Sequence, residues 1–158
     1  MTDTVEGVAV VLYTPMRDKA AQFGKPSAFP LVDGAEIRFQ RRRVGVVAAV
    51  WQERGQVLWR GLLDERQWPD ITAGGPPLRI PFVDPDVRAL VEERHLIGLP
   101  AVVQARTATR DGCMLLEDWT VVGMELMTTQ VAPWPGMELR LRAKDRKQAG
   151  ASRLAPGE

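Results

Sequence analysis

Two apolar runs joined by a short charged turn dominate the hydrophobic pattern of this chain. Both runs lie within residues 44–63, and each is rich in Val, Leu and Trp and long enough for a strand. Between them stands Glu53-Arg54-Gly55, a charged triplet that ends in glycine. Apolar runs on both sides of such a turn are typical of a β-hairpin. The pattern therefore predicts a hairpin over residues 44–63, around which the rest of the chain is arranged.

Short apolar segments predict further strands on both sides of this hairpin. The β-branched run 7–14 predicts a strand buried on both faces and ended by Pro15, and the alternation in 35–40 predicts a half-exposed strand. Between them, residues 15–30 mix charged residues, glycine and proline, which favours a long mobile connection. Further strands are expected at 78–83, 101–107, 113–116, 120–128 and 137–141, with a turn at 110–112 and an irregular loop over 64–77.

One helix is expected, from Pro85 to about residue 96. Asp84 suits the N-cap, and Pro85 suits the first helical position, where the missing N–H costs nothing. Gly98 stands where a glycine would end the helix. Three apolar residues fall on one stripe and are expected to face the core: Val87, Leu90 and Val91.

Seven or eight short strands and one principal helix predict a β-rich α+β fold. We expect a small β-barrel or a curled, mostly antiparallel sheet with the helix packed on it. The chain has 158 residues, of which 45% are hydrophobic, and this suits a single domain with one core. We expect residues 7–142 to form this domain and residues 1–6 to be a flexible N-terminus. Residues 143–158 are charged and lack aromatic side chains, so they are expected to be a disordered tail.

The net charge, the single cysteine and the N-terminal residues limit the classes of partner and the locations to expect. The formal net charge is +1, whereas dedicated nucleic-acid binders carry a basic excess, so no sequence-specific nucleic acid is expected. The single cysteine, Cys113, excludes an internal disulfide and favours a reducing compartment. The first residues lack the basic and apolar regions of a signal peptide, and no apolar run is long enough to cross a bilayer. We therefore expect neither secretion nor a membrane partner.

Candidate catalytic residues are few. The serines are Ser27, in a predicted loop, and Ser152, in the predicted tail. Cys113 and His95 could form a nucleophile–base pair, but a small apolar thiol and a histidine at a helix end explain them more simply. One histidine and one cysteine fall short of a zinc ligand set, and Gly74-Gly75 lacks the Lys-Ser/Thr of a phosphate loop. We predict no catalytic residue, no metal site and no cofactor.

Five residues are candidates for contact with a partner. Arg41, Arg42 and Arg43 form the densest charge run and could contact phosphate or an acidic surface, although a solvated strand end is the simpler interpretation. Trp68 and Trp134 stand beside prolines in presumed loops, and two interpretations of them stay open. They could be aromatic anchors for a protein partner, or they could cover the core of this domain.

From about residue 35 to residue 141, the order of elements resembles the prohead proteases of tailed phages, which are relatives of the herpesvirus assemblins. The matching segments are 37–46, 52–58, the helix 87–97 with the following 98–102, and 119–126 leading to 132–135. The resemblance implies a β-barrel surrounded by helices. Where that family has its catalytic histidine, this chain has Gln40 or the arginine run, and where the family has its serine nucleophile, it has Pro100. Neither an arginine nor a proline can perform those roles at neutral pH.

The resemblance and its departures imply a non-catalytic, prohead-protease-like assembly protein of a phage-type capsid. The expected partner is the major capsid protein or another head protein, and self-association into a homo-oligomer is left open. The expected location is the host cytoplasm or the capsid particle. Two alternatives remain: an active maturation protease with an unconventional nucleophile, Cys113 or Ser27 with His95, and an unrelated β-rich binding module.

Overall fold

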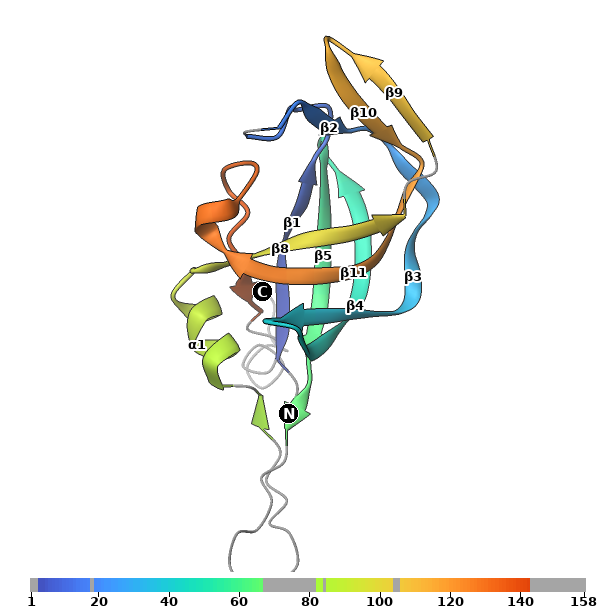
Figure 1. The fold of residues 1–158 in the computed structure, drawn as a ribbon. Coiled ribbons are helices and arrows are strands. Elements are labelled where there is room, and N and C mark those ends of the chain that lie inside the picture. Colours follow the sequence, from blue (N-terminus) through green and yellow to red (C-terminus); the bar gives the residue numbers. More distant parts are fainter. Residues whose placement is uncertain (1–2, 18, 67–81, 84, 104–105, 143–158) are drawn as a thin grey trace, which may run out of the picture.

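One curled sheet of seven strands makes up most of the fold (Figure 1). The computed structural model describes residues 3–17, 19–66, 82–83, 85–103 and 106–142. The sheet has the order β12-β1-β5-β4-β3-β11-β8, and smaller sheets are formed by β2-β10-β9 and by β6-β7. In chain order the elements are β1 (Thr4–Val11), β2 (Ala21–Phe23), β3 (Pro26–Phe39), β4 (Arg42–Glu53), β5 (Gln56–Leu63), β6 (Glu65–Arg66), β7 (Phe82–Val83), α1 (Pro85–Glu92), β8 (Leu96–Val103), β9 (Arg106–Arg110), β10 (Cys113–Glu117), β11 (Trp119–Thr128), the 3₁₀ turn η1 (Thr129–Val131) and β12 (Arg140–Leu141).

The prediction of a β-rich, curled and mostly antiparallel sheet is confirmed. Only two of the strand pairs in the described residues are parallel, β3 with β11 and β2 with β10. The sheet curls into a half-barrel, and the backbone N–H of Leu139 donates to the carbonyl of Leu96 at 2.9 Å, which ties the segment before β12 to the start of β8. Helix α1 packs close to this junction, with Val87 and Val91 buried and Leu90 packed against the core, as predicted.

The central hairpin is also confirmed. Strands β4 and β5 pair from Gly45 opposite Leu63 to Glu53 opposite Gln56. The two residues of the turn, Arg54 and Gly55, have φ angles of 52° and 79°. A two-residue turn with positive φ at both positions matches the twist of the flanking strands, which explains why this hairpin closes so tightly.

Trp59, on β5, fills the centre of the barrel, and glycines on β5 itself and on β8 make room for it. Its side chain is fully buried. A Cβ added at Gly98, on β8, would lie 2.5 Å from Cζ2 of Trp59, and one added at Gly61 would lie 2.8 Å from Cζ3. Gly98 was predicted to end the helix, and this is wrong: it lies inside β8, where the indole ring leaves no space for a side chain.

Helix α1 ends earlier than predicted, at Glu92, and a different residue ends it. The N–H of Arg94 donates to the carbonyl of Val91 at 3.0 Å, and the N–H of His95 donates to that of Leu90 at 2.9 Å. Arg94 has a φ of 61°. This is the Schellman arrangement, in which the left-handed position is usually glycine. Because an arginine occupies it here, no glycine marks the true end of the helix in the sequence. The predicted N-cap, Asp84, lies outside the described residues.

The first long connection is more ordered than predicted. Within residues 15–30 the chain forms β2 and the start of β3, and Phe23 is buried edge-to-face against Trp119, with ring centroids 5.1 Å apart. Strand β2 pairs with β10, about ninety residues away in the chain, so no local pattern reveals it. Strand β1 begins at Thr4, inside the segment predicted to be flexible, and ends at Val11 rather than at residue 14.

Several predicted elements are shifted or only partly described. Strand β8 begins at Leu96 and ends at Val103, whereas a strand was expected over 101–107. The turn at 110–112 between β9 and β10 is confirmed, with positive φ at Asp111 and Gly112. Of the predicted strand 78–83, Phe82 and Val83 form β7, and residues 67–81 and 143–158 lie outside the described part. Among the described helices, none is long and apolar enough to span a membrane.

Candidate functional site

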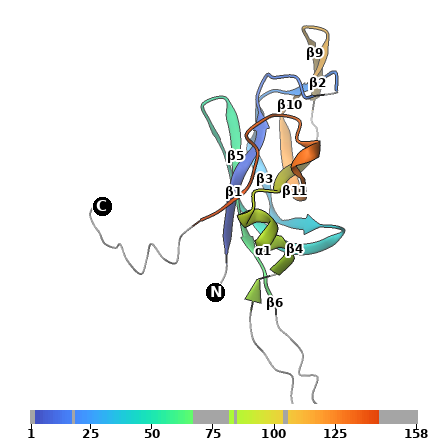
Figure 2. The same cartoon turned by 90° about the vertical axis from the view of Figure 1, so that its left-hand side faces the viewer.

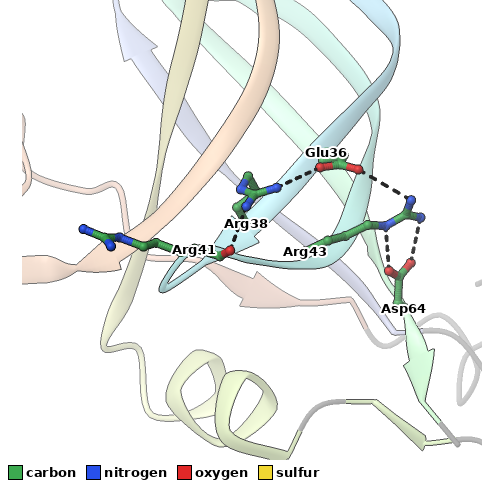
Figure 3. Close-up of polar contacts among 5 residues, drawn as sticks. All are labelled: Glu36, Arg38, Arg41, Arg43 and Asp64. Atoms are coloured by element: carbon green, nitrogen blue, oxygen red, sulfur yellow. Dashed lines mark hydrogen bonds and ion pairs between the residues drawn. The ribbon is translucent and has the colours of Figure 1, made fainter.

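The turn between β3 and β4 holds the arginine run in a fixed conformation. Gln40 and Arg41 form this turn, with φ angles of 51° and 71°. Neither is glycine, and left-handed backbone costs a residue with a Cβ roughly 1–2 kcal/mol. The guanidinium of Arg38 donates to the carbonyl of Arg41 at 2.7 Å, which stabilises the strained turn (Figure 3). The turn therefore presents Arg41 on a rigid support.

Arg43 performs a structural role within the same cluster. Its Nε donates to Oδ2 of Asp64 at 2.8 Å and its Nη2 to Oδ1 at 3.3 Å, a bidentate pair, and its Nη1 lies 3.8 Å from Glu36 (Figure 3). The hydrogen bond to Asp64 is the main cause that raises the pKa of Arg43 above its ordinary value, followed by the negative charge of the same carboxylate. Arg43 therefore joins β4 to the residue after β5.

The three arginines differ in how much of their charge is available. Arg42 lies over the ring of Phe39, with the guanidinium carbon 5.8 Å from the centroid, and is half-buried. The side chain of Arg41 is exposed and points away from the cluster (Figure 3), with no hydrogen bond or ion pair to any other described residue. Of the predicted arginine site, Arg41 is thus the member best placed to contact a partner.

Exposed apolar side chains gather on the outer face of β3, β11 and β8. Val121, on β11, is fully buried and pairs with Leu31 on β3 and Val102 on β8. Because successive side chains of a strand point to opposite faces, the neighbours of these three residues point outward. Three of them are exposed valines, one on each strand: Val32, Val103 and Val122.

Phe29 is a fourth exposed apolar residue, and its backbone lies close to β11. Its side chain is 82% exposed, the highest fraction among the large apolar residues that the structure describes. The hydroxyl of Ser27 donates to the carbonyl of Phe29 at 2.8 Å and lies 2.9 Å from the hydroxyl of Thr120, the residue that pairs with Val103. The backbone of Phe29 is thereby tied to β11. We name Phe29, Val32, Val103 and Val122 the outer patch.

A groove of about 320 Å³ connects the outer patch with the arginine turn. Val122 lines it at the patch and Arg38 at the turn, and Gly34 and Gly123 leave space between the strands. Glu125 adds a carboxylate to this lining, without an ion pair in the described part of the chain. The groove therefore runs from Val122 of the outer patch to Arg38, whose guanidinium contacts the turn that carries Arg41.

The candidate catalytic residues are held apart. The Ser27 hydroxyl is hydrogen-bonded to that of Thr120, near the start of β11. The carbonyl of His95 accepts a hydrogen bond from the N–H of Thr129, just past the end of the same strand. Nine residues at about 3.3 Å each separate these points by roughly 30 Å along the strand. Cys113 begins β10, which Figure 1 shows at the top of the fold, whereas α1 lies at the lower left of the barrel. His95 itself is exposed, with Nε2 3.6 Å from Glu93.

The two positions that the family resemblance assigns to catalysis flank β11. Pro100 lies on β8 opposite Met124, and Gln40 follows Phe39, which pairs with Leu126. Strand β8 is at the edge of the sheet, the place where a residue without an N–H is tolerated. Pro100 therefore fits its strand position but offers no nucleophile, and Gln40 forms the strained turn.

The predicted tryptophan anchors have different outcomes. Trp134 is 4% exposed, donates from Nε1 to the carbonyl of Thr14 at 2.9 Å, and packs against Phe23. Of the two interpretations that the sequence leaves open, the structure favours the second, in which Trp134 covers the core. Trp68 lies outside the described residues. The sequence did not single out Phe29, because a phenylalanine in a loop-like segment carries no signal of whether its ring is buried.

Neither metal sites nor relatives add to this picture. Within the described residues, no three His, Cys, Asp or Glu side chains are grouped so that they could hold a metal ion. Comparison of the chain with protein-family models, with curated proteins and with solved structures finds no match. The family resemblance therefore stays a prediction.

Proposed function

We propose that this chain is a non-catalytic assembly module of a phage-type capsid, which binds coat protein or another head protein through the outer patch and the arginine turn. One observation carries the proposal: four of the seven exposed large apolar side chains among the described residues lie on the adjacent strands β3, β11 and β8, beside a groove that Val122 and Arg38 line. Apolar patches of this kind, rimmed by polar residues, mark protein interaction sites.

The outer patch and the arginine turn would contribute different interactions with a partner. Burial of a phenylalanine side chain contributes about 1.5–3 kcal/mol to the free energy of binding. Phe29, the most exposed of the four residues, is therefore the natural anchor. An exposed arginine adds little affinity, but it steers an acidic partner and fixes its orientation. We therefore assign affinity to the outer patch and orientation to Arg41.

The non-catalytic part of the proposal is supported by the positions of the candidate groups. Ser27, His95 and Cys113 lie on separate parts of the fold, and the Ser27 hydroxyl is already bonded to Phe29 and Thr120. The coat or head protein enters as partner from the family resemblance, and a place in the host cytoplasm or in the particle follows from that partner.

Co-assembly tests the proposal. The chain is co-expressed with the coat protein of a tailed phage, and particles are separated on a density gradient. Wild type is expected to co-sediment with the particles, and Phe29→Asp combined with Val103→Asp is expected to abolish co-sedimentation. Val131→Asp is the matched control, because Val131 is equally an exposed valine but lies in η1, outside the patch. Equal loss with Val131→Asp, or no co-sedimentation of wild type, would overturn the assignment.

A second pair of variants examines the arginine turn. Arg41→Glu is expected to weaken co-sedimentation most strongly at low salt, because exposed charges act over a Debye length of about 10 Å at 0.1 M salt. Arg54→Glu is the control, since Arg54 is an exposed arginine with positive φ in the two-residue turn between β4 and β5.

The same gradient fractions test catalysis. We expect the coat protein to stay intact in the presence of the chain. Cleavage that is lost in His95→Ala would establish the protease alternative in place of this proposal.

A further inference from the structure

The sheet β2-β10-β9 projects from the barrel and leaves one strand edge open (Figures 1 and 2). Strand β9 pairs with β10 from Arg106 opposite Glu117 to Arg110 opposite Cys113, and it pairs with no other described strand. All five of its residues are exposed. One side of its backbone therefore presents unpaired N–H and C=O groups, which is a template for another strand.

The sequence of β9 reads the same in both directions: Arg106-Thr107-Ala108-Thr109-Arg110. Two copies that meet antiparallel about a two-fold axis at Ala108 place each threonine opposite a threonine and each arginine opposite an arginine. A two-fold interface requires a surface that is complementary to itself. Threonine pairs across antiparallel strands are favourable, and the smallest side chain, that of Ala108, lies on the axis.

The arginines would repel each other in this pairing if each lacked a counter-charge. Arg106 lies 3.0 Å from a carboxylate oxygen of Glu117 and 3.3 Å from one of Asp118. Arg110 lies over the ring of Tyr13 at 4.8 Å and 3.8 Å from Asp111. The hairpin thus supplies three carboxylates for two arginines, so each arginine pair at the interface has negative charge beside it.

We propose that β9 pairs with the β9 of a second copy of this chain, so that two three-stranded sheets join into one six-stranded sheet. Pairing with a strand of another protein would not explain why the sequence of β9 reads the same in both directions. Pairing between two copies of β9 covers the open edge of both strands. The product is therefore a closed dimer rather than a fibre. The open edge of β9 shares no residue with the outer patch, and the oligomeric state is measured without coat protein, so this proposal and the proposed function can fail independently.

Disulfide trapping tests the register. Residues directly opposite in an antiparallel pair have Cα atoms about 4.5–5.5 Å apart, which lies within the range that a disulfide spans. In a Cys113→Ser background, Ala108→Cys is expected to convert most of the protein to a covalent dimer under mild oxidation. Ala48→Cys, at an exposed alanine of β4, is the matched control and is expected to stay monomeric. Thr107→Cys alone should cross-link far less than Ala108→Cys, because Thr107 lies opposite Thr109 of the second copy.

Sedimentation velocity tests the association without a cross-link. Wild type is expected to sediment as a dimer at about 100 μM and to dissociate on dilution. Ala108→Arg places like charges on the axis and is expected to sediment as a monomer with a melting temperature within a few degrees of wild type, because the position is exposed. Ala48→Arg is expected to remain dimeric. Monomeric wild type at this concentration, dimeric Ala108→Arg, or equal cross-linking of Thr107→Cys and Ala108→Cys would each overturn the proposal.

Discussion

The barrel centre around Trp59 and the edge strand β9 use their residues in opposite ways. At the centre, glycines on β5 and β8 approach the indole ring so closely that even a methyl group would overlap it. On β9, every side chain is exposed and none is needed to fill space. The comparison separates two kinds of sequence constraint. Packing around Trp59 explains why the centre has glycines. Packing does not explain the sequence of β9, whereas the proposed pairing with a second copy does.

The largest expected effect is at the barrel centre. Gly98→Ala adds a methyl group 2.5 Å from Cζ2 of Trp59, and overpacking of this kind costs about 1–3 kcal/mol of unfolding free energy. Urea denaturation measures the loss. Gly123→Ala is the matched control, because its Cβ would meet only the carbonyl of Glu36, at 3.3 Å, and it should cost clearly less.

A double-mutant cycle attributes the effect to the ring. In a Trp59→Phe background the smaller side chain frees space, so Gly98→Ala should cost less there than in wild type. If the two substitutions are additive, the indole ring is not what excludes a side chain at residue 98.

The same contrast explains which parts of the fold the sequence predicted. The hairpin β4–β5 and the stripe of α1 follow from local signals, namely a glycine turn between apolar runs and a helical spacing of Val87, Leu90 and Val91. Strand β2 and the role of Gly98 depend on partners far away in the chain, Leu116 and Trp59 among them. Local patterns cannot show such partners, so the segment of β2 was expected to be a loop.

The candidate site divides in the same way. The sequence placed Arg41, Arg42 and Arg43 at a strand end, but their different environments depend on Asp64 and Phe39, which only the folded chain brings to them. Trp134 was a candidate anchor because prolines flank it, yet its indole packs on Phe23. Composition shows which residues can bind, and the three-dimensional neighbours decide which are free to do so.

An intermediate effect is expected at the β3–β4 turn. Replacement of Gln40 by asparagine together with Arg41 by glycine gives the pair that two-residue turns with positive φ favour. Relief of strain at these positions should raise the unfolding free energy by about 1 kcal/mol, so the melting temperature should rise by a few degrees. An unchanged or lower melting temperature would show that the turn is not strained. The proposed function further predicts that this variant, which lacks Arg41, binds coat protein more weakly while being more stable.

The smallest expected effect is at the exposed ion pair between Arg43 and Asp64. Both side chains are more than one-third exposed, and exposed ion pairs contribute about 0.2–1 kcal/mol, so Arg43→Ala should lower the unfolding free energy by less than 1 kcal/mol. The folded-state pKa of Arg43 is raised, so its contribution is complete below the unfolded pKa and is lost only as pH rises through the still higher folded value. Arg43 titration should therefore add no pH dependence between pH 6 and 10, whereas 1 M salt should reduce the difference between Arg43→Ala and wild type. Arg54→Ala, at an arginine without an ion pair in the described residues, is the control. A loss several times larger than this would place Arg43 with the barrel centre rather than with the exposed surface.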